Sequence, residues 1–268
     1  MKVPFTPAHA AAALPFRRFR LVTSALVVGT FAPDFEYFIR LAPRGGFGHT
    51  LLGAFVLSLP LALLVLWIFH AFVKRPLTSL MPNGIQDRLA SYLDKFRLFG
   101  SRRFAWIVIS ILLGIATHIF WDSFTHPTMW LYRHWSFLRQ TLRLPMVGPV
   151  LYYQLFQHSS TILGLGILGA WLLHWYRATV SGDQSRIGRL SRAHRLFITA
   201  VIATIALLGA AIRAIVGVGP PFHHGALEGF VGVAVCTFIA LTWWQLVAYG
   251  LFSALRKSSK AKAPARMR

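Results

Sequence analysis

Five long apolar stretches constrain the fold of this chain more than any other feature. A helix needs about 20 apolar residues to cross the hydrocarbon core of a membrane. Stretches of about this length lie at Thr50–Phe69, Phe104–Trp121, Val147–Tyr176, Leu196–Ile212 and Gly229–Phe252. A backbone in contact with lipid must satisfy its own hydrogen bonds, as a helix does. The sequence therefore predicts an all-α, polytopic helical membrane protein with five long transmembrane spans.

The composition agrees with this fold class. Hydrophobic residues make up 56% of the chain and charged residues only 13%, about half the charged share of a soluble domain. The net charge is nevertheless +21, which in a soluble protein would suggest nucleic acid. Here the positive charge lies between the apolar stretches, where it sets topology and contacts anionic headgroups. We expect membrane lipids as partners and no nucleic acid; the sequence leaves the oligomeric state open.

The basic residues alternate between successive loops. Lys and Arg are concentrated in 74–103, in 177–195 and in the C-terminal tail, whereas 217–225 has none. Loops rich in Lys and Arg remain on the cytoplasmic side of a membrane. We therefore expect these segments and the C-terminus in the cytoplasm, with His49 and His126 near the outer face.

The N-terminal segment is too short to form a further span of the usual length. Pro7 favours a short helix that ends near Leu14, and a second helix over Leu21–Phe31 would end at Pro33. If the two helices form an antiparallel re-entrant hairpin, His9 and Asp34 lie at the same end. If the second helix crosses instead, His9 lies on the cytoplasmic side, away from Asp34.

These elements predict a single integral membrane domain over residues 1–268. Its parts are an N-terminal hairpin with site residues (1–48), the first two spans with the remaining site (49–126), three further spans (147–252) and a basic cytoplasmic tail (253–268).

Acidic residues are rare in this chain, and some lie at the ends of apolar stretches. An ionisable group at such a place is expensive unless it is paired, and it often marks a functional site. His118, Asp122 and His126 follow one another at intervals of four, so they share one side of a helix. A His and an Asp at this spacing can hold a metal ion. The same pair fits equally well as a hydrogen bond that joins two helices.

Other candidate ligands join this pair if the hairpin forms. His49 follows a glycine-rich segment at the start of a span, and Asp34 follows a helix-ending proline. The predicted metal ligands are His9, Asp34, His49, His118 and Asp122. Nitrogen and oxygen donors without thiolates suit a divalent metal such as Zn, Mn or Fe, bound singly or as a two-metal centre. Glu36 and His126 are the predicted catalytic residues, as proton-transfer groups or partners of the ligands.

Several of these motifs resemble a known family. Thr-Pro-Ala-His at 6–9, Pro-Asp at 33–34, Gly-His-Thr at 48–50 and H-x-x-x-D at 118–122 are similar to YdjM-type proteins over about the first half of the chain. Those are bacterial membrane proteins regarded as metal-dependent hydrolases. The resemblance implies the five ligands named above. YdjM-type sequences carry a second Asp where Glu36 stands, which leaves the metal count open.

A closer resemblance extends into the later spans. Pro-Phe-Thr-Pro-Ala-His at 4–9, Ala-Pro-Asp-Phe at 32–35 and Gln-His-Ser-Ser at 157–160 are similar to a bacterial family of multi-pass membrane proteins of unknown function. Both resemblances imply a bacterial cytoplasmic (inner) membrane location.

Two functions follow. The first is a metal-dependent hydrolase that acts on a phosphoester or ester of a lipid or amphiphile. Arg40, Arg44 and Arg133 would attract the anionic head of this substrate. The second is a non-catalytic membrane protein, structural, lipid-interacting or transporting, whose His and Asp groups bond helices together. Separation of the five side chains by more than about 8 Å would favour the second, because metal–ligand bonds are near 2 Å.

Overall fold

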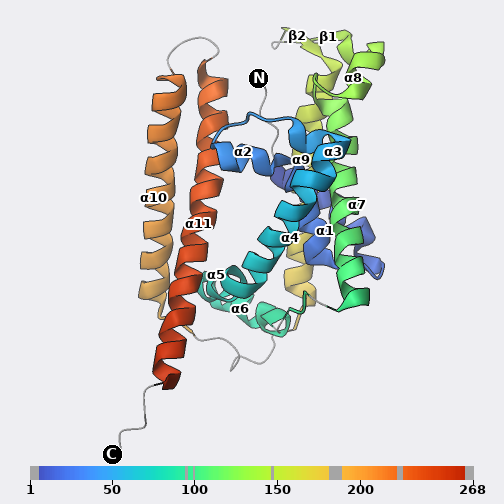
Figure 1. Ribbon diagram of the computed structural model, residues 1–268. Coiled ribbons are helices and arrows are strands. Elements are labelled where there is room, and N and C mark those ends of the chain that lie inside the picture. Colours follow the sequence, from blue (N-terminus) through green and yellow to red (C-terminus); the bar gives the residue numbers. More distant parts are fainter. Residues whose placement is uncertain are drawn as a thin grey trace, which may run out of the picture.

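The computed structural model describes residues 6–93, 96–98, 100–145, 148–180, 189–221 and 226–262. Its long helices run side by side between two ends of the molecule (Figure 1). They are α7 (Ser101–Thr125), α9 (Tyr152–Ala178), α10 (Arg192–Val218), α11 (Ala226–Lys262) and a segmented helix over Leu51–Leu80. The prediction of an all-α, polytopic fold is confirmed.

The segmented helix contains two π-helical turns. Its parts are α3 (Leu51–Gly53), η5 (Ala54–Ser58), α4 (Leu59–Ile68), η6 (Phe69–Val73) and α5 (Lys74–Leu80). The first π turn ends two residues before Pro60, which has no backbone N–H to donate to the preceding turn. The helix therefore continues past Pro60.

Among the described residues, four helices are long and apolar enough to cross a membrane: Leu51–Leu80, Ser101–His134, Arg192–Val218 and Ala226–Arg256. The predicted count of five spans was therefore too high by this criterion. The third predicted span forms the 27-residue helix α9, but polar side chains such as Gln154, Gln157 and His158 lower its hydropathy. Helix α9 still runs from one end of the molecule to the other (Figure 1).

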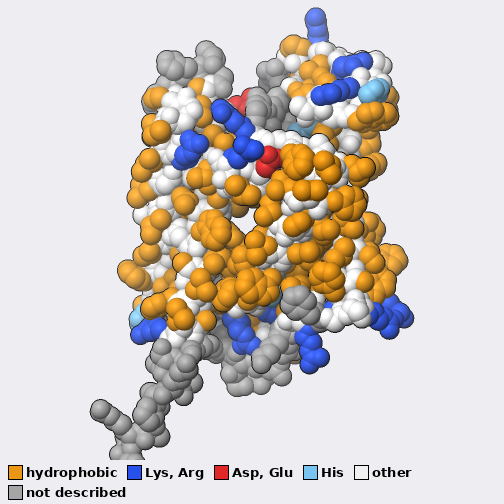
Figure 2. Space-filling view, in the orientation of Figure 1, with side chains coloured by type: hydrophobic (Ala, Val, Ile, Leu, Met, Phe, Trp, Pro, Cys, Tyr) orange, Lys and Arg blue, Asp and Glu red, His pale blue; other side chains and the backbone are white. Residues whose placement is uncertain are grey.

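The surface is that of a membrane protein. A wide band of hydrophobic side chains covers the middle of the molecule, and Lys and Arg lie toward its two ends (Figure 2). Two predicted cytoplasmic loops meet at one of these ends: Arg189 pairs with Asp87 at 2.5 Å, and Arg88 Nε donates to the Tyr176 carbonyl at 2.5 Å. We name this the basic end and the opposite one, where α7 finishes at Thr125, the site end. Which end faces the cytoplasm stays a prediction.

The N-terminal segment forms the expected hairpin, although its first arm is a 3₁₀ helix. The arms are η1 (Thr6–Ala13) with η2 (Pro15–Arg18), and α1 (Thr23–Gly29) with η3 (Ala32–Asp34). Thr6 Oγ1 donates a 2.5 Å hydrogen bond to Asp34 Oδ2, which joins the two ends of the hairpin. The chain thus enters and returns at the site end.

Close packing fixes this hairpin against α7. Gly29 of α1 faces the backbone of Ile111, and a Cβ there would overlap the Ile111 carbonyl oxygen. Gly114 of α7 likewise faces the Leu26 carbonyl oxygen. Ala25, Ile107 and Ile111 fill the contact and are fully buried. The two glycines therefore set the distance between the hairpin and α7.

The remaining elements are short or lie at the periphery. They are α2 (Phe35–Arg40), η4 (Phe47–His49), α6 (Asn83–Leu89), η7 (Ala90–Leu93), α8 (Trp130–His134), η8 (Ser136–Arg139) and two strands. The strands, β1 (Thr141–Leu144) and β2 (Gly148–Leu151), pair antiparallel with Leu142 opposite Val150 and were not predicted. The predicted tail begins within α11, and its last residues, 263–268, lie outside the described residues.

Candidate metal centre

Four elements bring the five predicted ligands together at the site end. His9 comes from η1, Asp34 from η3 and His49 from η4, whereas His118 and Asp122 lie one turn apart on α7. The side chains of Asp34 and His118 are fully buried, and Asp122 is 2% exposed. Among the described residues, two groups could hold a metal ion: His9, His118 and Asp122, and Asp34, His49 and His118.

The nitrogen and oxygen atoms of four side chains face one another. His49 Nε2 lies 3.3 Å from Asp34 Oδ1, 3.2 Å from Asp122 Oδ2 and 3.3 Å from His118 Nε2. His118 Nε2 lies 3.2 Å from Asp122 Oδ2 and 3.7 Å from Asp34 Oδ1. Tetrahedral ligands with bonds of 2.0–2.1 Å stand about 3.3–3.4 Å apart. The observed separations are close to those of a ligand set.

The orientation of His118 favours a free Nε2. Its Nδ1 lies 2.7 Å from the Thr30 carbonyl oxygen, which can only accept a hydrogen bond. Nδ1 must therefore carry the proton, and in the neutral ring Nε2 keeps its lone pair. Such a hydrogen bond to a backbone carbonyl commonly orients a histidine ligand. Thr30 reaches this position because α1 packs so closely on α7.

The second oxygen of Asp122 faces two further histidines. Asp122 Oδ1 lies 3.4 Å from His9 Nε2 and 3.4 Å from His126 Nδ1. The His9 ring stacks on His118 with ring centroids 4.1 Å apart. Asp122 therefore presents one carboxylate oxygen to the pair His49 and His118 and the other to the pair His9 and His126. This arrangement is compatible with either one or two metal ions.

Several polar atoms in the cluster lack a hydrogen-bond partner. Asp34 Oδ1, Asp122 Oδ1 and His126 Nε2 are buried without one, which is costly in a protein interior. A cation between the donor atoms would satisfy the two carboxylate oxygens. Protonated imidazoles could also compensate them: burial lowers the pKa of His49, but the nearby carboxylates of Asp122 and Asp34 outweigh it and raise this pKa to about 9.

Glu36 lies beside the cluster and holds the loop that carries His49. Its Oε2 accepts hydrogen bonds from the backbone N–H of Phe47 at 3.1 Å and of Gly48 at 3.4 Å. Its Oε1 accepts from Arg40 at 3.0 Å. Burial disfavours the charged carboxylate, but the Arg40 guanidinium and these amides outweigh it and lower the pKa of Glu36. With these contacts Glu36 positions His49, and its predicted catalytic role stays a prediction.

Gly48 is required for this loop to approach the hairpin. A Cβ at Gly48 would crowd the Pro33 carbonyl oxygen, and Pro33 immediately precedes Asp34. The Gly48 carbonyl in turn accepts a hydrogen bond from Ser58 Oγ at 3.2 Å. Gly48 thus lets His49 and Asp34 come together. This gives a structural role to the glycine of the Gly-His-Thr motif at 48–50.

Two contributors were missed at the sequence level. Thr6 was not among the predicted site residues, but its hydroxyl donates to Asp34. Thr30 contributes the backbone carbonyl that accepts from His118. Every residue has such a carbonyl, so a sequence pattern cannot identify this contact. By contrast, His158 is exposed on α9 and takes no part in the cluster. Asp94 and Asp183 lie outside the described residues.

A comparison with known protein families gives one result. A model described as a domain of unknown function, DUF4184, matches residues 3–251. No curated protein and no solved structure matches the chain. The match covers the candidate metal centre and the later helices alike. It agrees with the predicted resemblance to a family of unknown function, whereas the likeness to YdjM-type proteins and the bacterial origin stay predictions.

Proposed function

The chain belongs to the DUF4184 family, whose function is unknown, and we propose that it is a membrane-embedded, metal-dependent hydrolase. The observation that carries this proposal is the convergence of Asp34, His49, His118 and Asp122 at separations of 3.2–3.7 Å. Their donor atoms lie in a buried site where two carboxylate oxygens lack hydrogen-bond partners. A divalent metal such as Zn, Mn or Fe fits this donor set, which contains no sulfur.

A bound metal of this kind supplies an activated water and polarises a phosphoryl or acyl oxygen. The protein's own residues provide the rest. Thr30 holds the His118 ring through Nδ1, and Glu36 holds the loop that presents His49. His126 contacts Asp122 through Nδ1 while its buried Nε2 has no partner. This free nitrogen could accept or deliver a proton, so we assign proton transfer to His126 in the proposed reaction.

The position of the centre supports an amphiphilic substrate. The cluster lies at the site end, where the apolar band of the surface gives way to charged side chains (Figure 2). Arg40, whose side chain is 58% exposed, adjoins the cluster through its ion pair with Glu36. An amphiphile could place its anionic phosphate near Arg40 while its tail remains in the membrane. We therefore propose a phosphoester or carboxylic ester of a lipid as the substrate class.

Metal analysis of the purified full-length protein tests the first half of the proposal. We expect at least one equivalent of a divalent metal in wild type and none in His118→Ala, whose Nε2 faces Asp34, His49 and Asp122. His158→Ala is the matched control, because His158 is exposed on α9. A wild-type protein that neither retains nor takes up Zn, Mn or Fe would contradict the proposal and favour a polar network that only bonds helices together.

Hydrolysis needs a separate assay. The metal-loaded protein in mixed micelles is given phosphatidic acid, with phosphate release as the readout, or a lipid carboxylic ester, with acid release as the readout. We expect turnover of one class, its loss in His118→Ala and in chelator-treated protein, and its recovery on return of the metal. A fully loaded protein without turnover of either class would refute hydrolysis and leave the metal centre in place.

A further inference from the structure

The basic end contains a cavity that the proposed metal centre does not use. The cavity is shallow and wide open to the outside, with a volume of about 290 Å³. Five residues line it: Arg20, Val22, Arg102, Arg103 and Trp106. Three of them carry a guanidinium group and none carries a carboxylate. The cavity lies at the end of α7 opposite His118 and Asp122, so it is distinct from the metal centre.

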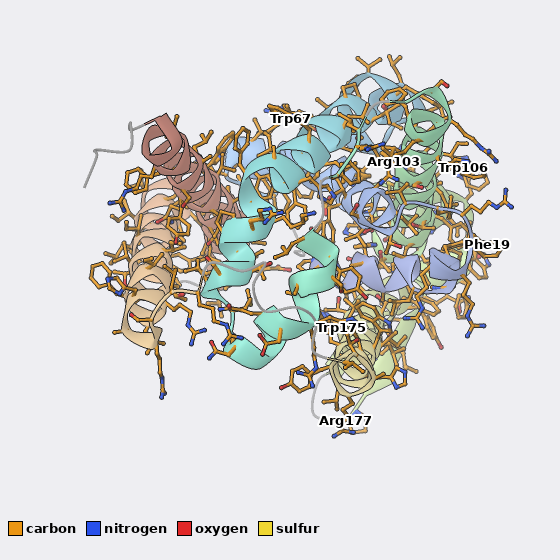
Figure 3. The ribbon with its side chains drawn as sticks, turned by 90° about the horizontal axis from the view of Figure 1, so that it is seen from below. Phe19, Trp67, Arg103, Trp106, Trp175 and Arg177 are labelled. Atoms are coloured by element: carbon orange, nitrogen blue, oxygen red, sulfur yellow. The ribbon has the colours of Figure 1, made fainter. Side chains whose placement is uncertain are left out.

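Two separate elements supply the cationic groups. Arg20 and Val22 belong to the tip of the N-terminal hairpin, between η2 and α1, whereas Arg102, Arg103 and Trp106 lie in the first turns of α7. Figure 3, which views the molecule from below, shows Arg103 and Trp106 on the same side of the molecule as Phe19 at the hairpin tip. Phe19 is 65% exposed.

Hydrogen bonds hold this cavity in shape. The backbone N–H of Val22 donates to Ser110 Oγ at 2.9 Å, and Ser110 Oγ donates to the Trp106 carbonyl at 2.6 Å. Arg103 Nε donates to the Arg97 carbonyl at 2.7 Å, and its guanidinium lies 5.2 Å from the centre of the Phe96 ring. Among the described residues, no hydrogen-bond partner occupies the two terminal nitrogens of Arg103, so they are available to a ligand. The Arg103 guanidinium is thus oriented before any ligand binds.

We propose that this cavity binds a phosphate group and that the source of the phosphate is the headgroup of an anionic membrane lipid. Guanidinium groups bind phosphate oxygens in pairs, and gathering three of them without a carboxylate favours an anionic ligand. Trp106 is an aromatic side chain of the kind that settles at headgroup level. Val22 and the apolar face of α7 provide a surface along which an acyl chain can lie.

The proposed lipid would also join the hairpin tip to α7. Arg20 and Arg102 come from different elements, so a shared phosphate would draw the two together and offset their mutual repulsion. This inference does not depend on hydrolysis at the metal centre. It would give the Arg20 guanidinium at the hairpin tip an anionic partner.

Lipid binding to the full-length protein in a neutral detergent provides the test. The probes are dioleoyl phosphatidic acid, dioleoyl phosphatidylcholine and inorganic phosphate, each measured by native mass spectrometry or by a shift in the thermal unfolding midpoint. We expect phosphatidic acid to bind the wild type more tightly than phosphatidylcholine, and millimolar inorganic phosphate not to displace it. Arg20→Gln/Arg102→Gln should bind phosphatidic acid about tenfold more weakly or worse.

The matched control removes two arginines from elsewhere at the same end. Arg177→Gln/Arg192→Gln changes the net charge equally, and both residues are exposed, so it should bind phosphatidic acid as wild type does. Arg20→Lys/Arg102→Lys keeps the charge and checks that the fold tolerates substitution; it should bind with intermediate strength. Equal losses of lipid affinity in the control and in the first variant would show that binding depends only on net charge, which would overturn the proposal. Displacement of the lipid by inorganic phosphate would overturn the assignment of its source.

Discussion

The two ends of this molecule place their aspartates in different surroundings. At the site end, Asp34, His118 and Asp122 are buried and face one another across distances of 3.2–3.7 Å. At the basic end, Asp87 pairs with a single arginine, Arg189, and their side chains are 13% and 39% exposed. A sequence shows only the residue types. The structure shows that the carboxylates of the site end are enclosed, whereas the pair at the basic end is partly open to solvent.

The degree of burial decides which of these charged groups need a ligand. Burial of a charge in an apolar surrounding is costly unless it is paired or liganded. An exposed ion pair changes stability by only about 0–1 kcal/mol. The buried cluster must therefore be compensated by a bound cation or by protons, whereas the exposed pair at the basic end requires no ligand. Substitutions at matched residues of the two ends should separate these cases.

The largest effect is expected from Asp122→Ala. This change removes the carboxylate that contacts His9, His49, His118 and His126 together. Bound metal, measured by mass spectrometry of the purified protein, should fall to background. Asp87→Ala removes a carboxylate at the basic end and should leave the metal content at its wild-type value. Full metal content in Asp122→Ala would show that the cluster does not depend on its central carboxylate.

A large effect on stability is expected from Gly114→Leu. The new side chain would overlap the backbone of α1 at Leu26, and overpacking of this kind typically costs about 1–3 kcal/mol. The thermal unfolding midpoint in detergent should fall, and metal affinity should fall with it because Thr30 directly follows α1. Gly169→Leu is the control, since a Cβ at Gly169 meets nothing within 4 Å. Equal midpoints for both variants would argue against the close packing of the hairpin on α7.

A smaller effect is expected from Glu36→Gln. The amide keeps the size of the side chain but binds Arg40 and the amides of Phe47 and Gly48 more weakly. Loss of a residue that orients a metal ligand typically lowers affinity by about 10- to 100-fold. Metal titration against a competing chelator should show this reduction while full loading remains possible at high metal concentration. Complete loss of metal would instead make Glu36 a direct ligand.

The smallest effect is expected from Arg40→Gln. The guanidinium of Arg40 is largely exposed and pairs with Glu36 four residues earlier, so its removal should change stability by no more than about 1 kcal/mol. Metal content should stay at the wild-type value. If Arg40 also attracts an anionic substrate, the Michaelis constant should rise while turnover at saturation is retained. A loss of bound metal would show that Arg40 supports the centre itself.

The sequence predicted the elements with the strongest patterns. Hydropathy located the helices around Thr50–Phe69, Phe104–Trp121, Leu196–Ile212 and Gly229–Phe252, because crossing a membrane requires a long apolar run. It overcounted at α9, where the length suffices but polar residues such as Gln157 lower the hydropathy. The strands β1 and β2 were missed because they are four residues each and join no larger sheet.

The sequence identified the residues of the candidate site but only some of the contacts between them. Rare acidic residues at the ends of apolar stretches identified Asp34 and Asp122, since ionisable groups there are expensive. The convergence of His9 with Asp122 depends on the hairpin, which the sequence allowed without requiring. The contact between Thr30 and His118 could not be predicted, because it uses a backbone carbonyl placed by helix packing.

X-ray absorption spectroscopy of the metal-loaded, full-length protein would identify the atoms that hold the metal. We expect only nitrogen and oxygen neighbours at about 2.0–2.2 Å, with the outer-shell signature of imidazole. This spectrum should disappear in His118→Ala but not in His158→Ala. A spectrum dominated by sulfur neighbours, or one that is unchanged in His118→Ala, would contradict the proposed metal centre.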